Sequence, residues 1–151
     1  MKKKVVLAFS GGLDTTYCAK YLTEDLGYEL HTAIVNTGGF SKEELIDIEK
    51  KAYELGVTSH TTLDIIEKYY AECVKYMVYG NILRNNTYPL SVSAERVFQA
   101  MAIAEHAKKV GATAVAHGST GAGNDQVRFD VVFMIMNPGI EIITPIRDMK
   151  L

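Results

Sequence analysis

The sequence predicts a single α/β domain, with an open parallel sheet of about five strands and helices on both faces. Continuous apolar runs alternate with segments of helical spacing, and a glycine-rich turn follows two of the runs. Strands that alternate with helices form parallel sheets through right-handed crossovers. The chain has 151 residues, of which 48% are hydrophobic, which suits one domain with its own core.

Three strands are predicted in the first half of the chain. The apolar run at residues 5–9 is typical of a strand that is buried on both faces of a sheet. Residues 30–35 and 57–63 predict the second and third strands. Each of the three is followed by a segment with helical spacing.

The helices of this half are marked by their ends. The first begins at or is capped by Asp14, carries Cys18, Leu22 and Leu26 on one face, and ends at Gly27. The second begins with a capping box of Ser41 and Glu44 and ends at Gly56. A third helical segment contains Ile66, Tyr69, Tyr70, Cys73 and Met77. Its aromatic residues are expected in the core or in subunit contacts.

The second half predicts a loop, a long helix and two further strands. Residues 81–89 form the loop, because Tyr88 precedes a proline and should be extended. A helix over residues 93–110 ends at Gly111, and its apolar positions are Ala94, Val97, Met101, Ala104 and Ala107. Residues 112–116 and 141–144 predict the last two strands, separated by a second glycine-rich turn, an apolar segment and an Asn-Pro-Gly turn.

Charge and composition exclude several functions. The formal net charge is −2 and the one basic block is residues 2–4, so the cationic footprint of a nucleic-acid-binding protein is missing. The apolar run that follows is too short for a signal peptide or a membrane span. We therefore expect a cytoplasmic protein with neither nucleic-acid nor membrane partners. Cys18 and Cys73 lack metal-ligand or redox spacing and are expected to be reduced, buried thiols.

The first glycine turn, AFSGGLDTT at residues 8–16, is the strongest functional signal. A P-loop needs a lysine directly after its last glycine, and none follows Gly12 until Lys20. The dinucleotide fingerprint also fails, because Gly11 and Gly12 are adjacent. What remains is a loop whose N–H groups and hydroxyls face outward at a helix N-terminus, a place for phosphate or pyrophosphate.

Asp14 stands within this turn, where its carboxylate would repel a phosphate. A Mg²⁺ ion between the two groups would remove the repulsion. The alternative is that Asp14 only caps the helix, and the sequence leaves both open.

Four segments, in order, resemble the argininosuccinate synthases, which belong to the N-type ATP pyrophosphatases. AFSGGLDTT resembles the first signature of that family and GSTGAGNDQVRF at 118–129 the second. YPLSVS at 88–93 resembles its citrulline-binding segment, and VNTGG at 35–39 its adenine-side loop. The resemblance extends from about Val5 to Arg147 and implies a Rossmann-like fold of the adenine nucleotide alpha hydrolase type.

The resemblance implies a ligase of arginine biosynthesis and the urea cycle. ATP converts the ureido oxygen of citrulline into a citrullyl-adenylate with release of pyrophosphate, and the amine of aspartate displaces AMP to give argininosuccinate. The implied cofactors are ATP and Mg²⁺, the implied partners are these small molecules, and the full-length protein should be a homotetramer. Such displacements need aligned substrates and a stabilised phosphate charge, and no protein nucleophile.

The motif match assigns residues to each ligand. The ATP site would contain Ala8, Phe9, Ser10, Gly11, Gly12, Leu13, Asp14, Thr15, Thr16, Val35, His117 and Gly118. Citrulline would be held by Tyr88, Ser93, Asn124 and Arg128, and aspartate by Thr120, Asn124 and Asp125. Asp14, Asp125 and Arg128 would be the catalytic residues. By themselves, Tyr88 and Ser93 could be a turn and a helix start, and His117 a structural histidine. His31, His60 and His106 are scattered and are expected to be structural or exposed.

Four residues depart from the family pattern. Ala122 replaces a usual lysine, Gly39 a usual glutamine, and Glu95 with Val97 change an Ala-Arg-Pro tripeptide. These changes leave open how the second loop meets the phosphates and whether the acceptor is free or acylated citrulline.

Family members continue into a second domain that completes the citrulline site and assembles the tetramer. Residues 1–151 are therefore expected to be an ATP-binding domain that binds nucleotide but turns over poorly alone. Two other functions stay open: a non-catalytic ATP- or AMP-binding module and, less favoured, a tRNA-modifying ATP pyrophosphatase. Low basic charge and the lack of paired catalytic cysteines argue against the latter.

Overall fold

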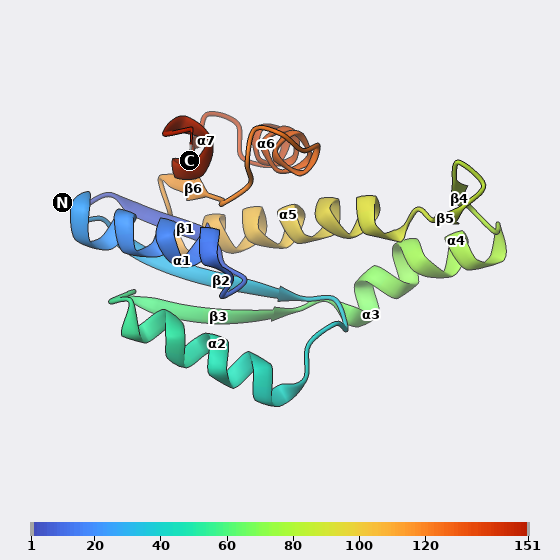
Figure 1. Cartoon of the computed structure of the whole chain (residues 1–151), viewed down its shortest axis with the longest axis horizontal. Coiled ribbons are helices and arrows are strands. Elements are labelled where there is room, and N and C mark those ends of the chain that lie inside the picture. The colour runs from blue at the N-terminus through green and yellow to red at the C-terminus, as the bar shows by residue number, and fades with distance from the viewer. Residues whose placement is uncertain (1, 151) are drawn as a thin grey trace.

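The computed structural model describes residues 2–150, which form a parallel sheet between two layers of helices (Figure 1). The sheet has the order β3-β2-β1-β6-β7, and all of its pairings are parallel. Its strands are β1 (Lys4–Ala8), β2 (Glu29–Asn36), β3 (Ser59–Asp64), β6 (Ala114–Ala116) and β7 (Glu141–Ile143). The predicted fold class is confirmed.

The strand order places a topological switch point beside β1. The chain first adds β2 and β3 on one side of β1 and later adds β6 and β7 on the other. The connections that leave the carboxyl ends of β1 and β6 therefore diverge, and a crevice opens between them. The first glycine-rich turn follows β1, and the second follows β6.

Each face of the sheet has its own apolar core. On one face, Val5, Leu7 and Leu30 pack with Cys18, Leu22 and Ala52 of the helical layer that contains α1 (Leu13–Lys20) and α2 (Lys42–Glu54). On the other face, Val6, Ala33 and Val115 pack with residues of α5 (Ser91–Val110) and α6 (Asp125–Met136), such as Ile103, Ala107 and Phe133. The short α7 (Pro145–Asp148) adds Ile146 to the first core.

The first helix continues past α1 into a π-helical turn, η1 (Tyr21–Asp25). Cys18 and Leu22 are fully buried as predicted, but Leu26 is exposed. The N–H of Leu26 donates to the carbonyl of Tyr21, five residues earlier, so the wider turn moves Leu26 off the buried face. The prediction that Leu26 shares this face was wrong.

The predicted capping box of α2 is confirmed. The Ser41 hydroxyl accepts from the Glu44 N–H at 3.2 Å, and the Glu44 carboxylate accepts from the Ser41 N–H at 2.8 Å. Such a cap stabilises a helix by about 1 kcal/mol. The helix ends before Gly56, whose positive φ of 76° favours glycine.

Residues 66–90 form an arm that projects beyond the sheet (Figure 1). It contains α3 (Ile66–Tyr69), η2 (Tyr70–Val74), α4 (Lys75–Tyr79), and the antiparallel strands β4 (Leu83–Arg84) and β5 (Tyr88–Pro89). The predicted loop at 81–89 is thus a small hairpin, because Asn85 and Asn86 both adopt positive φ and make a tight reversal. Of the tyrosines in the helical part of the arm, Tyr69 is buried whereas Tyr70, Tyr76 and Tyr79 are exposed.

The long helix α5 begins two residues earlier than predicted and ends at Gly111, with φ of 67°. Ala104 and Ala107 are buried as predicted, but Ala94, Val97 and Met101 are only partly buried. The first turns of α5 extend beyond the sheet toward the arm, and the second half packs against it (Figure 1). The third, fourth and last strands are each shorter than predicted.

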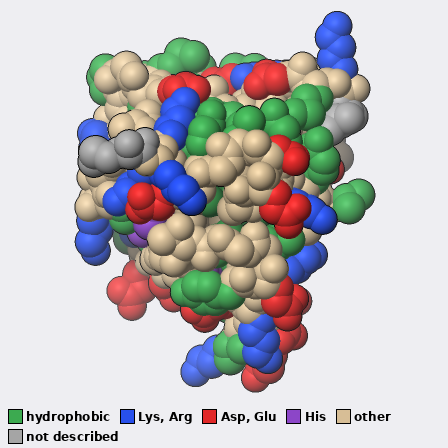
Figure 2. Space-filling model, turned by 90° about the vertical axis from the view of Figure 1, so that its left-hand side faces the viewer, with side chains coloured by type: hydrophobic (Ala, Val, Ile, Leu, Met, Phe, Trp, Pro, Cys, Tyr) green, Lys and Arg blue, Asp and Glu red, His purple; other side chains and the backbone are tan. Residues whose placement is uncertain are grey.

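The polar residues of the core and the surface also differ in part from expectation. Burial raises the pKa of the Cys18 thiol to about 11, whereas Cys73 is only half-buried, contrary to prediction. His31, His60 and His106 are all buried. On the end of the molecule away from the arm, basic and acidic side chains are intermixed (Figure 2). Among residues 2–150, no helix is both long enough and apolar enough to cross a membrane.

The buried histidines predict a loss of stability in mild acid. Burial lowers the pKa of His60 and of His106 below the usual 6.5, so the unfolded chain binds these protons more readily. Their contribution to the free energy of unfolding is complete above about pH 6.5 and decreases as the pH falls toward the folded pKa values. Thermal melts at pH 7.5, 6.5 and 5.5 should show a falling Tm, by about 2–4 °C for each kcal/mol lost.

The variant His106→Gln should reduce this pH dependence, because glutamine does not titrate. If the unaltered chain has the same Tm at pH 7.5 and pH 5.5, the buried histidines do not have the lowered pKa values given above.

Candidate functional site

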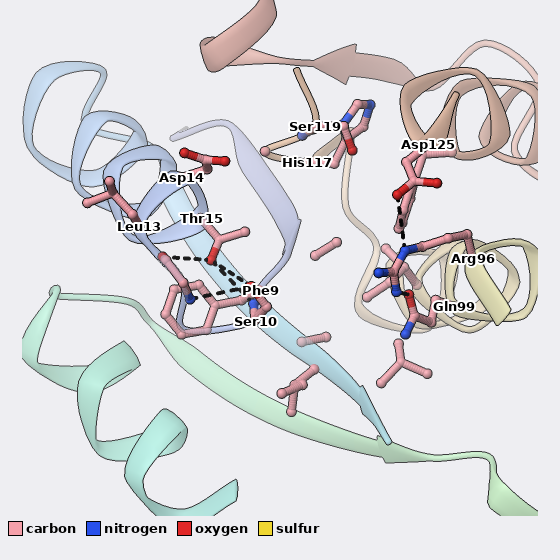
Figure 3. Close-up of a pocket in the computed structure, with 18 of the residues that line it drawn as sticks. Phe9, Ser10, Leu13, Asp14, Thr15, Arg96, Gln99, His117, Ser119 and Asp125 are labelled. Carbon is pink, nitrogen blue, oxygen red and sulfur yellow. Dashed lines mark hydrogen bonds and ion pairs between the residues drawn. The ribbon is translucent and has the colours of Figure 1, made fainter. Parts of the chain in front are cut away.

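A pocket with a volume of about 400 Å³ opens at the carboxyl ends of β1 and β2, next to the end of β6 (Figure 3). Cavities of this size hold small organic ligands. Its lining comes from the first glycine turn, β2, the loop after it, α5, the second glycine loop and α6. The lining residues that the sequence predicted are Ala8, Phe9, Ser10, Gly12, Leu13, Asp14, Thr15, Val35, His117, Gly118 and Asp125.

The backbone of the first glycine turn leaves N–H groups available to a ligand. Gly11 has a φ of 73°, and a Cβ there would lie 3.1 Å from a side-chain carbon of Ile48 on α2. Gly12 is the N-cap of α1 and offers no side chain to its first turn. The dipole of α1 adds partial positive charge at the same place. The turn can therefore bind an anion through its backbone.

Hydroxyl groups hold the turn closed. The Thr15 hydroxyl lies 3.3 Å from the Ser10 N–H, 3.2 Å from the Ser10 hydroxyl and 3.2 Å from the Gly12 carbonyl. The Thr16 hydroxyl lies 3.5 Å from the Gly11 carbonyl, at the limit of a hydrogen bond. The Leu13 side chain is 85% exposed at the edge of the pocket.

The second glycine loop packs directly onto the first turn. A Cβ at Gly118 would lie 3.3 Å from both the backbone nitrogen and the Cγ2 of Thr15. Only glycine allows the two loops to come this close without displacement. The structure thus brings together two segments that are about a hundred residues apart in the sequence.

His117 holds the second glycine loop in place through hydrogen bonds of both ring nitrogens. Its Nε2 lies 2.9 Å from the Asp130 carboxylate, and its Nδ1 accepts from the Ser119 N–H at 3.2 Å. Asp130 also accepts from Arg147 at 2.7 Å. Because Nδ1 accepts, the proton is on Nε2, and both ring nitrogens are engaged within the protein. The ring lines the pocket, but its hydrogen bonds position the loop.

Both members of this pair have shifted pKa values. Burial lowers the pKa of His117 and outweighs the opposing effect of Asp130, which keeps the imidazole neutral. Burial would raise the pKa of Asp130, but hydrogen bonds from His117 and Arg147 hold it below the usual value. Asp130 is therefore ionised when His117 is neutral.

A charged cluster lies at the opposite wall of the pocket, to which it contributes Arg96, Gln99 and Asp125 (Figure 3), whereas its Arg128 and Ser93 lie outside the lining. Asp125, at the start of α6, pairs with Arg128 at 2.6 Å and with Arg96 of α5 at 3.3 Å. Arg128 also donates to the Ser93 hydroxyl at 3.1 Å, and Arg96 donates to the Gln99 side chain at 2.8 Å. Three predicted residues thus lie together here, and Arg96 joins them.

Other predicted residues lie outside the pocket lining. Gly11 and Thr16 belong to the first turn behind Gly12. Asn124 and the exposed Thr120 belong to the second loop, with Asn124 as the N-cap of α6. Tyr88 is on the hairpin of the arm, and its side chain is 44% exposed.

Several lining residues were missed from the sequence: Ala33, Ile34, Phe40, Arg96, Gln99, Ile103, Ser119 and Phe129. A signal existed for those on α5. Arg96, Gln99 and Ile103 follow Ser93 at helical spacings of three and four, so they share its face of the helix. The apolar residues carry no chemistry that the sequence could mark.

Comparisons with known proteins find relatives that match almost the whole chain. Residues 4–151 match the family model described as Arginosuccinate synthase N-terminal HUP domain. The argininosuccinate synthase of Methanocaldococcus jannaschii is 42% identical over 151 residues, covering 100% of this chain and 38% of that protein. That of Xylella fastidiosa is 45% identical over 148 residues, covering 98% of this chain and 36% of that protein. The chain thus spans little more than a third of the length of these relatives.

Solved structures share the fold at low sequence identity. A predicted subunit of tRNA methyltransferase from Methanocaldococcus jannaschii has a TM-score of 0.63 and 19% identity, covering 96% of this chain and 69% of that one. NMN synthetase from Francisella tularensis has a TM-score of 0.60 and 17% identity, covering 79% of this chain and 46% of that one. These likenesses concern the architecture alone.

The contact between the two glycine loops predicts different effects at two glycines of the second loop. Gly118→Val should force the loop away from Thr15 and destabilise the domain by about 1–3 kcal/mol, the usual cost of overpacking. Gly123→Val is the matched control, because a Cβ there meets no atom within 4 Å. Urea unfolding of both variants measures the difference. Equal free energies of unfolding would mean that the loops do not need this close approach.

Proposed function

This chain belongs to the argininosuccinate synthase family, and we propose that it is the ATP-binding domain of a longer ligase. That ligase would join citrulline and aspartate through a citrullyl-adenylate, releasing pyrophosphate and AMP. The observation that carries the proposal is the contact of the two glycine loops at the switch point, beside one pocket. Two loops that meet in this way offer backbone donors from both sides to a polyphosphate.

The pocket has separate regions for the two ends of ATP. The triphosphate would lie on the first glycine turn, with Ser10 and Thr15 beside it and Gly118 closing over it. The apolar side chains of Val35, Phe40 and other lining residues would take the base. Gly11, Thr16 and Tyr88 lie outside the pocket lining and are proposed as site residues from the motif match alone.

Arg96 is proposed as the cationic contact of the nucleotide. Among the residues that line the pocket, it is the one lysine or arginine, and it shares the lining with two carboxylates, Asp14 and Asp125. A guanidinium binds phosphate through fixed parallel donors. Arg96 is therefore the side chain that can stabilise charge on the α-phosphate when the adenylate forms.

Mg²⁺ is proposed to accompany ATP. No cluster of three metal-binding side chains is present among residues 2–150. Mg²⁺ needs none, because it keeps several waters and binds one or two carboxylates together with the phosphates of its substrate. The exposed carboxylate of Asp14, on the first turn of α1, meets that requirement. When bound, the ion would neutralise charge on the leaving pyrophosphate.

The two amino-acid substrates are assigned to the charged wall. The Asp125 carboxylate would accept hydrogen bonds from the ammonium group of aspartate, and Thr120 and Asn124 would lie beside this group. Arg128, with Ser93, would bind the carboxylate of citrulline, and Tyr88 of the arm would complete this side. In this arrangement the protein aligns the amine and the activated ureido carbon and stabilises charge, and it supplies no nucleophile.

The proposal extends to a second domain and a homotetramer in the full-length protein, and to a cytoplasmic location. The second candidate is a module that binds ATP without catalysis. A tRNA-modifying enzyme is less favoured, because the net charge is −2 and the charges in Figure 2 are mixed.

Calorimetry and a pyrophosphate assay distinguish these candidates. We expect this chain to bind ATP with Mg²⁺, and to release little or no pyrophosphate when citrulline and aspartate are added. Pyrophosphate release that depends on citrulline would show that this domain alone assembles the adenylation site. The absence of ATP binding would refute the proposed function, and salt-dependent tRNA binding would favour the tRNA enzyme.

Arg128 gives a prediction for substrate specificity. Arg128→Ala should weaken citrulline binding by about 10- to 100-fold, the loss expected for a hydrogen bond to a charged group. ATP binding should change less than about twofold, because Arg128 does not line the nucleotide pocket. Lys109→Ala, an exposed residue in the last turn of α5, is the control. Equal weakening of both ligands in isothermal titrations would assign Arg128 a structural role.

A further inference from the structure

We propose that Lys51 of α2 is a positioning residue that holds the phosphate-binding turn in its binding conformation. It would do so by fixing the peptide between Gly11 and Gly12, with the carbonyl turned toward α2 and the N–H turned toward the pocket. The inference rests on the proposed function and concerns the same turn. No part of the motif match assigns a role to Lys51.

The contact is short and comes from a distant part of the chain. The Lys51 ammonium donates to the Gly11 carbonyl at 2.6 Å, across forty residues of sequence. Within the described residues, no carboxylate lies within 4.0 Å of this ammonium. Ile48, one turn earlier on α2, packs under Gly11 from the same side. The partly buried ammonium therefore has the Gly11 carbonyl as its hydrogen-bond partner.

The orientation of this peptide decides whether an N–H group or a carbonyl oxygen faces the pocket. In a trans peptide, the carbonyl and the N–H point in opposite directions. With the Gly11 carbonyl directed at Lys51, the Gly12 N–H points to the other side, where Gly12 lines the pocket. That N–H donates to the Ser10 hydroxyl at 3.4 Å, a long contact that a phosphate oxygen can replace.

Two adjacent glycines make such a lock necessary. Glycine populates positive and negative φ about equally, so the peptide between Gly11 and Gly12 meets little steric resistance to rotation. Rotation would present a carbonyl oxygen to the phosphate in place of an N–H. The Thr16 hydroxyl lies 3.5 Å from the same carbonyl and is too distant to prevent this alone. The ion–dipole contact from Lys51 is the stronger restraint.

The positive charge of Lys51 acts in the same direction. The pocket lining carries two carboxylates and one guanidinium, which Asp125 already partners. A polyphosphate that enters it therefore needs further positive charge. An ammonium directly behind the turn supplies this charge without occupying the space of the ligand.

The test compares three ligands in calorimetric titrations: ATP, pyrophosphate and adenosine. Lys51→Met keeps most of the side-chain stem and removes the ammonium, so ATP and pyrophosphate should bind at least about tenfold more weakly. Adenosine, which carries no phosphate, should bind within about twofold of the unaltered chain. Lys51→Arg should recover most of the loss. Lys50→Met, on the exposed side of the same helix, should change nothing.

Unchanged affinity of Lys51→Met for ATP and pyrophosphate would overturn the inference, as would equal weakening of all three ligands. If the unaltered chain binds neither phosphate ligand, both the proposed function and the inference about Lys51 are refuted. If the unaltered chain binds them and the variant does so equally well, the inference alone falls.

A second measurement needs no substitution. In NMR titrations of the unaltered chain with pyrophosphate, the amide proton of Gly12 should shift downfield much more than that of Gly56, at the far end of α2. A Gly12 amide that does not respond to bound pyrophosphate would refute the proposed orientation of the peptide.

Discussion

The position of β1 between β2 and β6 is the constraint on which the rest of this molecule depends. Its parallel register with both neighbours places the end of β1 beside the end of β6, so the two loops that follow emerge at one edge of the sheet. Gly118 can then pack against the first turn of α1. If β6 paired elsewhere, the second glycine loop would have no contact with the first.

The two walls of the pocket are built from different kinds of interaction. The glycine-turn wall is backbone, shaped by close approach and held from behind by Ile48 and Lys51. The opposite wall contains the charged side chains of Arg96 on α5 and Asp125 on α6, which pair with one another. Backbone geometry is fixed by the fold, whereas paired side chains can exchange partners when a ligand arrives. The first wall is thus suited to hold phosphate and the second to select the groups that react with it.

The sequence predicted most of the fold because the strong signals were local. Continuous apolar runs, the Ser41–Glu44 cap and glycines at helix ends each depend on a few neighbouring residues. The errors arose where local patterns give no information about tertiary context. Leu26 left the buried face through a π-helical turn, and the start of α5 extended past the sheet, so its apolar stripe was only half used. In the site, predicted residues of both glycine turns line the pocket, and the helical spacing from Ser93 was an unused signal for Arg96. Lys51 carried no such signal, because its contact with Gly11 joins two elements that are far apart in the sequence.

The unequal burial of the two cysteines makes the arm accessible to chemical labelling. Thiols react as thiolates, and the Cys18 thiol, fully buried with a pKa of about 11, is neutral and shielded at neutral pH. Burial raises the pKa of Cys73 as well, but this thiol, in η2, remains partly open to solvent. A maleimide dye at neutral pH would therefore attach mainly to the arm, without any engineered cysteine. The chain thus carries its own attachment point for a spectroscopic probe on the arm.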